Sequence, residues 1–138
     1  MKDSINVKWI ENMAFEAEVD GVKIKLDTLS EHGGTNQGPR PKPLLMVALA
    51  GCTAMDVISL MKKMRVDVDE FNVRVDGELT EEHPKQFTSM LIVYSFKGNN
   101  IDEEKVKKAI NLSLEKYCGV SASLKKVMDI NYKIEINT

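Results

Sequence analysis

A long apolar segment in the first half of the chain constrains the fold more than any other feature. Between Leu44 and Met55 only Thr53 is polar, and the charged residues Lys42 and Asp56 bound the segment. This length is well short of the roughly 20 residues that cross a bilayer as a helix. We therefore expect a buried helix and no association with a membrane.

The same helix is expected to run from about Pro43 to about Arg65. A proline is tolerated in the first turn because its missing N–H has no intrahelical partner there. The helix is apolar nearly all round in its first half, so one sheet can cover only one of its faces. A second copy of the chain is the simplest cover for the rest, which predicts a homodimer with this helix at its centre.

Strand patterning surrounds this helix, because hydrophobic and polar residues alternate in six other segments. These segments are 5–9, 15–19, 22–26, 71–75, 90–96 and 130–136. Asp20-Gly21 separates the second and third segments and is typical of a tight hairpin.

A second helix is expected before the last strand. Asn100 is placed to cap it, Glu103 to bond back to its first turn, and Gly119 to end it. Its apolar stripe consists of Val106, Ala109, Ile110, Leu114 and Tyr117. A short helical turn is expected over 121–127.

The predicted order is therefore β-β-β-α-β-β-α-β. Because the strands arrive as hairpins rather than in βαβ alternation, we expect an antiparallel sheet with helices on one face, the α+β class. A length of 138 residues without repeats or a low-complexity linker fits a single domain over 1–138.

Charge and the N-terminal segment restrict the partners and the location. The 19 basic and 21 acidic residues are spread along the chain and give a net charge of −2, so nucleic acid is not an expected partner. Residues 1–4 lead directly into the first alternating segment and lack the apolar core of a secretory signal. We expect a cytoplasmic protein.

The two cysteines are the main candidates for chemistry. Their separation of 66 residues (118 minus 52) is not a zinc-ligand spacing, and a reducing compartment disfavours a structural disulfide. Cys118 is expected at a helix C-terminus, where the helix dipole disfavours a thiolate, so Cys52 is the expected nucleophile. Arg40 and Lys42 are the nearest cations in sequence that could stabilise its thiolate. Cys118 would then close a disulfide on the sulfenic acid. Two inert buried thiols remain the alternative.

Other ionisable residues give weaker indications. His32 and His83 are far apart, so neither a metal site nor a Cys–His dyad is expected. Asp56 lies one helical turn after Cys52 on the same face. It could tune the thiol, whose pKa its charge would raise, or cap a polar spot at the dimer interface.

Two segments resemble the cysteine motifs of the OsmC/Ohr family, and specifically its OsmC-like branch. The first runs from Gly38 to Val57 around Ala50-Gly51-Cys52-Thr53, and the second from Glu115 to Leu124 around Tyr117-Cys118-Gly119. The segment Glu82-His83-Pro84-Lys85 also resembles the hairpin turn of family members. The resemblance covers nearly the whole chain and implies an intertwined homodimer, with two long central helices back to back, sheets wrapped around them and a peroxide site at the subunit interface.

The resemblance also implies the roles of the two sulfurs. Cys52 would be the peroxidatic thiol and Cys118 the resolving thiol, with a dithiol as reductant and no metal or organic cofactor. The implied activity is that of a thiol-dependent peroxidase, which reduces organic hydroperoxides and, less efficiently, hydrogen peroxide. One position departs from the family pattern: a glutamate is usual nine or ten residues before the first cysteine, where this chain has Pro43 and Lys42. Support for the thiolate would then have to come from Arg40 and Lys42.

Two alternatives of other classes stay open at this stage. A dimer without turnover could bind an apolar small molecule at the helix interface. A thioesterase of the hot-dog type also wraps an antiparallel sheet around a long apolar helix, and its carboxylate would be Asp56.

Overall fold

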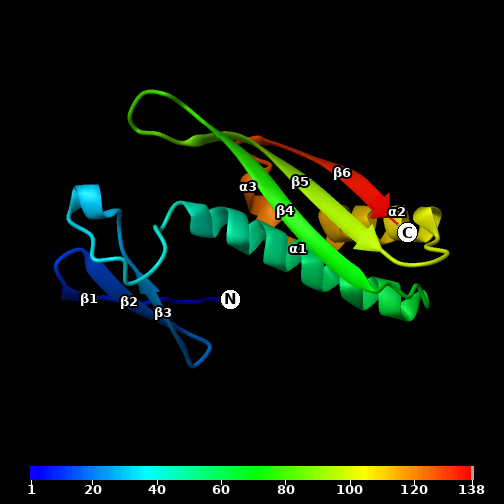
Figure 1. Ribbon diagram of the computed structural model, residues 1–138, viewed down its shortest axis with the longest axis horizontal. Coiled ribbons are helices and arrows are strands. Elements are labelled where there is room, and N and C mark those ends of the chain that lie inside the picture. The colour runs from blue at the N-terminus through cyan, green and yellow to red at the C-terminus, as the bar shows by residue number, and fades with distance from the viewer. Residues whose placement is uncertain (138) are drawn as a thin grey trace. The chain divides into compact units, whose positions relative to one another are not determined.

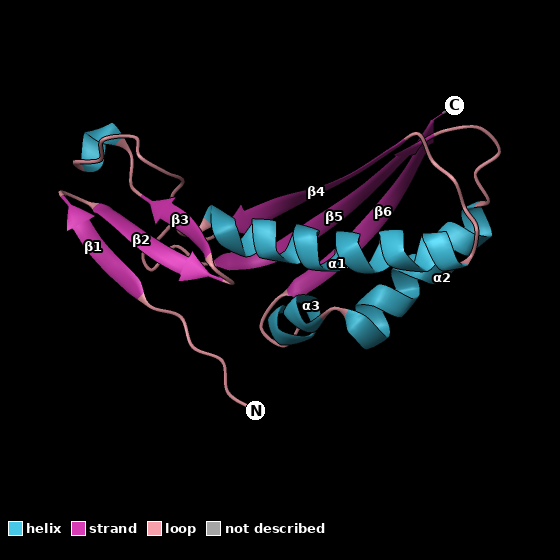
Figure 2. Ribbon diagram, turned by 90° about the horizontal axis from the view of Figure 1, so that it is seen from below, coloured by secondary structure: helices cyan, strands magenta, loops and turns pink. Residues whose placement is uncertain are grey.

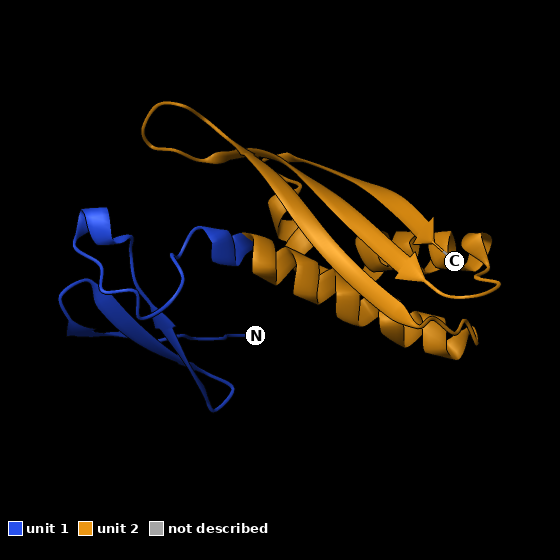
Figure 3. Cartoon of the chain, viewed as in Figure 1, with its two compact units in different colours: residues 1–45 blue, residues 46–138 orange. Residues whose placement is uncertain are grey.

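The computed structural model describes residues 1–137 (Figure 1). The chain divides into two compact units, Met1–Leu45 and the part from Met46 onward, which we call the first and the second unit (Figure 3). That the whole chain behaves as one domain stays a prediction.

The first unit contains the three expected strands. β1 (Val7–Glu11), β2 (Ala14–Val19) and β3 (Val22–Leu26) form an antiparallel sheet in the order β1-β2-β3. Asp20 and Gly21 join β2 to β3 with φ values of 51° and 79°. Two successive positive φ values match the right-handed twist of the strands, which explains the hairpin signal in the sequence. A 3₁₀ turn, η1 (Ser30–His32), follows.

Asp27 organises the loop that follows β3. Its buried carboxylate accepts hydrogen bonds from the backbone N–H groups of Thr28 at 2.7 Å, Thr35 at 3.1 Å and Gln37 at 3.1 Å. These bonds, of which that from Thr28 contributes most, lower the pKa of Asp27 below its ordinary value. Gly34 lets the backbone of this loop pack closely, because a Cβ there would lie 1.8 Å from the carbonyl oxygen of Thr28.

The second unit contains a three-stranded sheet. β4 (Glu70–Leu79), β5 (Phe87–Lys97) and β6 (Asp129–Asn137) lie in the order β4-β5-β6. β4 and β5 are antiparallel, but β5 and β6 are parallel. The expectation of an entirely antiparallel sheet is therefore wrong for the last pair. The chain leaves β5 through helices and returns in the same direction, as a crossover connection requires.

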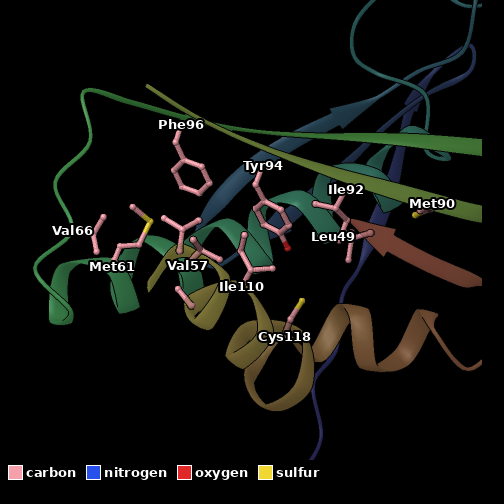
Figure 4. Packing of buried hydrophobic residues seen from close by; sticks show 12 residues of the cluster. Leu49, Val57, Met61, Val66, Met90, Ile92, Tyr94, Phe96, Ile110 and Cys118 are labelled. Carbon is pink, nitrogen blue, oxygen red and sulfur yellow. The ribbon is translucent and has the colours of Figure 1, made fainter. Parts of the chain in front are cut away.

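The long apolar helix is α1 (Pro43–Lys63), close to its predicted range. Figure 2 shows the helices of the second unit on one face of its sheet. The buried residues of α1 recur at every fourth position, which forms a stripe on one side of the helix. They are Leu49, Thr53, Val57 and Met61. They pack against Ile92, Tyr94 and Phe96 of β5 in the core drawn in Figure 4.

A tight turn with a non-glycine residue ends α1. Arg65 has φ 58°, its N–H donates to the carbonyl of Lys62, and the N–H of Val66 donates to that of Met61. This pair of bonds is the Schellman arrangement and satisfies carbonyls that the end of the helix would leave free.

The rest of α1 leaves apolar side chains accessible. Val47 is 62% exposed and Met55 is 72% exposed. Among the described residues α1 is the one helix long and apolar enough to cross a membrane, a measure that the core helix of a globular protein also meets.

The second predicted helix is shorter and is divided. α2 (Glu103–Leu112) continues into a π-helical turn, η2 (Ser113–Tyr117), and a separate short helix, α3 (Gly119–Leu124), follows. Asp102 caps α2 by accepting from two backbone N–H groups, whereas Asn100, the predicted cap, has φ 56° and lies in the preceding turn. Gly119, the predicted stop, directly follows Cys118, the C-cap of η2, and also begins α3.

Candidate active site

The fold brings the two cysteines together in the second unit. Cys52 and Cys118 are free thiols, and their sulfur atoms and one carboxylate oxygen of Asp56 all lie within 4.8 Å of one another. A disulfide has an S–S length of about 2.05 Å, so the two sulfurs must approach by less than about 3 Å to bond. Side-chain rotation and small backbone shifts can produce this approach without refolding of the unit.

The π-helical turn η2 determines where Cys118 lies. After this wider turn Cys118 takes an extended conformation (φ −77°, ψ 98°), and its N–H donates to the carbonyl of Ser113 at 2.7 Å. Its sulfur accepts from the N–H of Ser121 at 3.4 Å, so Cys118 also caps the N-terminus of α3. Cys118 is thus the C-cap of η2, which confirms its predicted place at a helix C-terminus, and it is also the N-cap of α3. The dipole of α3 acts on this sulfur in the opposite sense to that of the preceding helix, so the helix dipole alone does not distinguish the two thiols. Single π turns are frequent at functional sites.

Burial distinguishes the two thiols instead. Cys118 is 3% exposed, and burial raises its pKa although hydrogen bonds from Ser121 act in the opposite direction. Cys118 is therefore a neutral thiol near pH 7. Cys52 is partly exposed, so a reagent in solution reaches it more easily. The geometry thus favours the same order of reactivity that was predicted on different grounds.

A chain of buried hydroxyl groups ends on the carboxylate beside the sulfurs. Ser113 Oγ donates to Asp56 Oδ2 at 2.9 Å, Thr53 Oγ1 lies 2.8 Å from Ser113 Oγ, and Tyr94 OH lies 2.7 Å from Thr53 Oγ1. Each hydroxyl has a single hydrogen. Since that of Ser113 is directed to Asp56, Thr53 must donate to Ser113 and Tyr94 to Thr53. Burial raises the pKa of Tyr94, which keeps it protonated as the first donor.

Sequence reasoning found only part of this group. Thr53 was visible as the single polar residue in the apolar segment, and Asp56 as the acid one turn after Cys52. Ser113 and Tyr94 were missed, because they lie on two other elements and neither stands in a motif. The available signal was Thr53, because a polar side chain in an otherwise apolar, buried helix needs a hydrogen-bond partner.

Arg40 and Lys42 belong to the first unit, and both are exposed. Arg40 lies at a pocket of about 430 Å³ that is lined within that unit by residues including Thr28, Asn36 and Pro39. Stabilisation of the Cys52 thiolate by Arg40 or Lys42 stays a prediction.

Comparison with known proteins identifies the family. Residues 34–133 match the family model described as OsmC-like protein. The chain belongs to the OsmC family. This confirms the resemblance carried by the two cysteine motifs and the predicted α+β fold class.

Relatives of this OsmC protein match nearly its whole length. Protein YhfA of Escherichia coli strain K12 is 34% identical over 131 residues, which cover 94% of this chain and 95% of YhfA. The crystal structure of a hypothetical protein from Aquifex aeolicus VF5 has a TM-score of 0.82 at 25% identity and covers 99% of this chain and 98% of its own. The organic hydroperoxide resistance protein OhrB of Bacillus subtilis has a TM-score of 0.67 at 15% identity, covering 98% of each chain, so it shares the fold.

Proposed function

We propose that this OsmC protein is a cytoplasmic, thiol-dependent peroxidase that reduces organic hydroperoxides and, less efficiently, hydrogen peroxide. The observation that carries the proposal is the placement of the Cys52 and Cys118 sulfurs within 4.8 Å of each other on two different elements. Family membership supports a redox role related to peroxide resistance. OhrB, named for organic hydroperoxide resistance, has the same fold.

In the first step the Cys52 thiolate attacks the terminal oxygen of the hydroperoxide. The S–O bond forms, the O–O bond breaks, and the alkoxide leaves and takes up a proton to give the alcohol. Cys52 is thereby oxidised to a sulfenic acid. The assignment to Cys52 rests on its partial exposure, whereas burial keeps Cys118 protonated and out of reach.

In the second step the Cys118 thiol attacks the sulfenic sulfur. An S–S bond forms, the S–O bond breaks, and water leaves. Cys118 must lose its proton, and the Asp56 carboxylate lies within 4.8 Å of both sulfurs. Asp56 can therefore take the proton from Cys118 and deliver it to the departing hydroxyl group. The bond from Ser113 holds Oδ2, which leaves the other carboxylate oxygen for this exchange.

A pocket next to the site supports an organic substrate. It has a volume of about 370 Å³ and is lined by Met55, Asp56, Ser59, Leu60, Lys63 and Tyr117. The side chains of Met55, Leu60 and Tyr117 offer apolar surface to the alkyl part of a hydroperoxide, a contact that hydrogen peroxide cannot use. A dithiol would then reopen the disulfide and restore both thiols, which completes a turnover.

The protein is further proposed to act as a homodimer. Val47 and Met55 leave apolar surface of α1 exposed, and a second copy packed about a two-fold axis would remove it from water. Sedimentation of the reduced protein as a dimer at micromolar concentration is the expected result, and a monomer at all concentrations would contradict it.

The test of the peroxidase is consumption of cumene hydroperoxide in the presence of excess dithiothreitol. The parent should turn over and Cys52→Ser should be inactive. Cys118→Ser, treated with the hydroperoxide before any dithiothreitol is added, should accumulate the sulfenic acid instead of an internal disulfide. Ser123→Ala, an exposed hydroxyl on α3, is the matched control and should behave as the parent. A Cys52→Ser variant as fast as the parent would refute the mechanism.

The two alternatives fare differently. The hot-dog thioesterase assumed another fold, and OsmC family membership removes its basis. The other alternative is a dimer that binds an apolar molecule without turnover. It stays open because Lys42 and Pro43 stand where family members usually have a glutamate. Recovery of a bound apolar ligand from a protein whose thiols are inert to peroxide would support it.

A further inference from the structure

The cluster of Cys52, Asp56 and Cys118 has a second chemical property, which follows from its donor atoms. Two sulfurs and a carboxylate oxygen within 4.8 Å of one another form a compact set of ligands. Zn²⁺ binds sulfur at about 2.3 Å and carboxylate oxygen at about 2.0–2.2 Å, so tetrahedral ligands lie about 3.5–3.8 Å apart. The donors need to contract by about 1.3 Å at most to reach these separations. We propose that the reduced protein binds one Zn²⁺ per chain through these three side chains.

The backbone supports this geometry in advance. Cys52 and Asp56 lie one turn apart on α1, the spacing that allows two side chains of one helix to hold the same zinc ion. Cys118 approaches from the extended residue between η2 and α3, so the third ligand comes from a separate, packed element. Donors fixed on rigid elements lose little conformational freedom when the ion binds. The distance in sequence between the cysteines hides this arrangement, which arises only in the fold.

Two of the three proposed ligands, Asp56 and Cys118, already accept hydrogen bonds from neighbouring residues. Ser113 donates to the carboxylate of Asp56, and the N–H of Ser121 donates to the sulfur of Cys118. Such contacts orient the ligands of zinc sites. The pocket of about 370 Å³ beside Asp56 gives the ion a route to the site and leaves space for water as the fourth ligand.

The charge of the three ligands and the softness of their thiolate sulfurs favour Zn²⁺ over other divalent ions. With both thiols deprotonated the three ligands carry three negative charges, of which Zn²⁺ neutralises two. Thiolates prefer Zn²⁺ to the harder Mg²⁺ and Ca²⁺. Binding must release the protons of the thiols, so the affinity should weaken as the pH falls. A disulfide removes two ligands, so metal binding and oxidation of this pair exclude each other.

The first experiment uses Co²⁺ as a spectroscopic substitute, added to the reduced, full-length protein and then displaced by Zn²⁺. One equivalent per chain should produce the near-ultraviolet thiolate-to-cobalt band and the visible bands of tetrahedral Co²⁺. Cys52→Ser and Cys118→Ser should each reduce the thiolate band, and Asp56→Asn should weaken binding at least about tenfold, a loss that even outer contacts can cause. Asp129→Asn, which removes an exposed carboxylate, is the control and should bind as the parent does.

A second measurement needs no variant and does not depend on the peroxidase activity. Zn²⁺ should slow alkylation of the two thiols by iodoacetamide at least about tenfold, and a chelator should restore the rate. Cobalt binding without a thiolate band, unchanged binding by Cys118→Ser, or alkylation that is insensitive to Zn²⁺ would overturn the proposal. Protection without peroxide turnover would keep the metal site and reject only the proposed catalysis.

Discussion

The buried hydroxyl chain makes a quantitative prediction at Thr53. Thr53→Val keeps the shape of the side chain but removes the acceptor of the Tyr94 hydroxyl, which is fully buried. An orphaned buried hydroxyl costs about 1–3 kcal/mol, and Ser113 keeps its bond to Asp56. We expect the free energy of unfolding to fall by about 2 kcal/mol.

The partner substitution separates this cost from packing. Tyr94→Phe keeps the ring, including its edge-on contact with Tyr132 at 5.9 Å, and leaves Thr53 bonded to Ser113. It should cost about 1 kcal/mol. The double variant has no tyrosine hydroxyl left without an acceptor. Its loss of unfolding free energy should therefore be smaller than the sum of the two single losses by about 1 kcal/mol.

The assay is urea unfolding of the reduced proteins followed by far-ultraviolet circular dichroism. All variants are compared at one protein concentration, because the apparent stability of a dimer depends on concentration. Thr88→Val, an exposed threonine on β5, is the control and should change stability by less than about 0.5 kcal/mol. Strict additivity of Thr53→Val and Tyr94→Phe, or a Thr53→Val variant as stable as the parent, would refute the hydroxyl chain.

Three further predictions test the site and the loop of the first unit. Asp56→Asn should slow closure of the disulfide by about 10²-fold, since it removes the proton acceptor, and should change sulfenic acid formation little. Quenched-flow trapping with dimedone measures both rates. Equal closure rates in the variant and the parent would exclude Asp56 as the proton acceptor. Because burial raises the pKa of Cys118, the folded state keeps a proton that the unfolded state releases, so the free energy of unfolding should fall as the pH rises above about 9. Urea midpoints between pH 7 and 10 measure this slope, which Cys118→Ala should reduce. Gly34→Ala should lower stability by about 1–3 kcal/mol, because its Cβ would meet a backbone oxygen at 1.8 Å, whereas Gly119→Ala, with open space, should be nearly neutral in the same thermal melts.

Local patterns predicted most of the elements. Alternation located all six strands, and the apolar segment located α1 within about two residues, because both depend on which side chains must leave water. The direction of β6 was not predictable in this way. An alternating segment reads the same in a parallel or an antiparallel pair, and the choice depends on the crossover through α2 and α3.

Helix ends were harder to predict. Asn100 and Asp102 are both good capping residues, and the structure uses Asp102 while Asn100 takes a left-handed turn. The π-helical turn at Ser113–Tyr117 has no signature in the sequence. Cys118 ends this turn and also caps α3, so it lies between two helix ends. The predicted effect of one helix dipole on Cys118 is therefore opposed by that of α3.

The reactive residues of the candidate site were predictable from the sequence, but its hydrogen-bond network was not. Cys52 and Cys118 were identified from residue type and motif, and Asp56 from its helical spacing. The hydroxyl groups of Tyr94 and Ser113 reach the site from β5 and η2, and such long-range contacts follow only from the packed fold.

The central claim is that Cys52 and Cys118 form one redox site. The most direct measurement is treatment of the reduced protein with one equivalent of cumene hydroperoxide, followed by digestion without reductant and mass spectrometry. The account predicts a Cys52–Cys118 cross-linked peptide formed within a single chain, together with loss of both free thiols. Two thiols that stay free, or disulfides found only between chains, would contradict it.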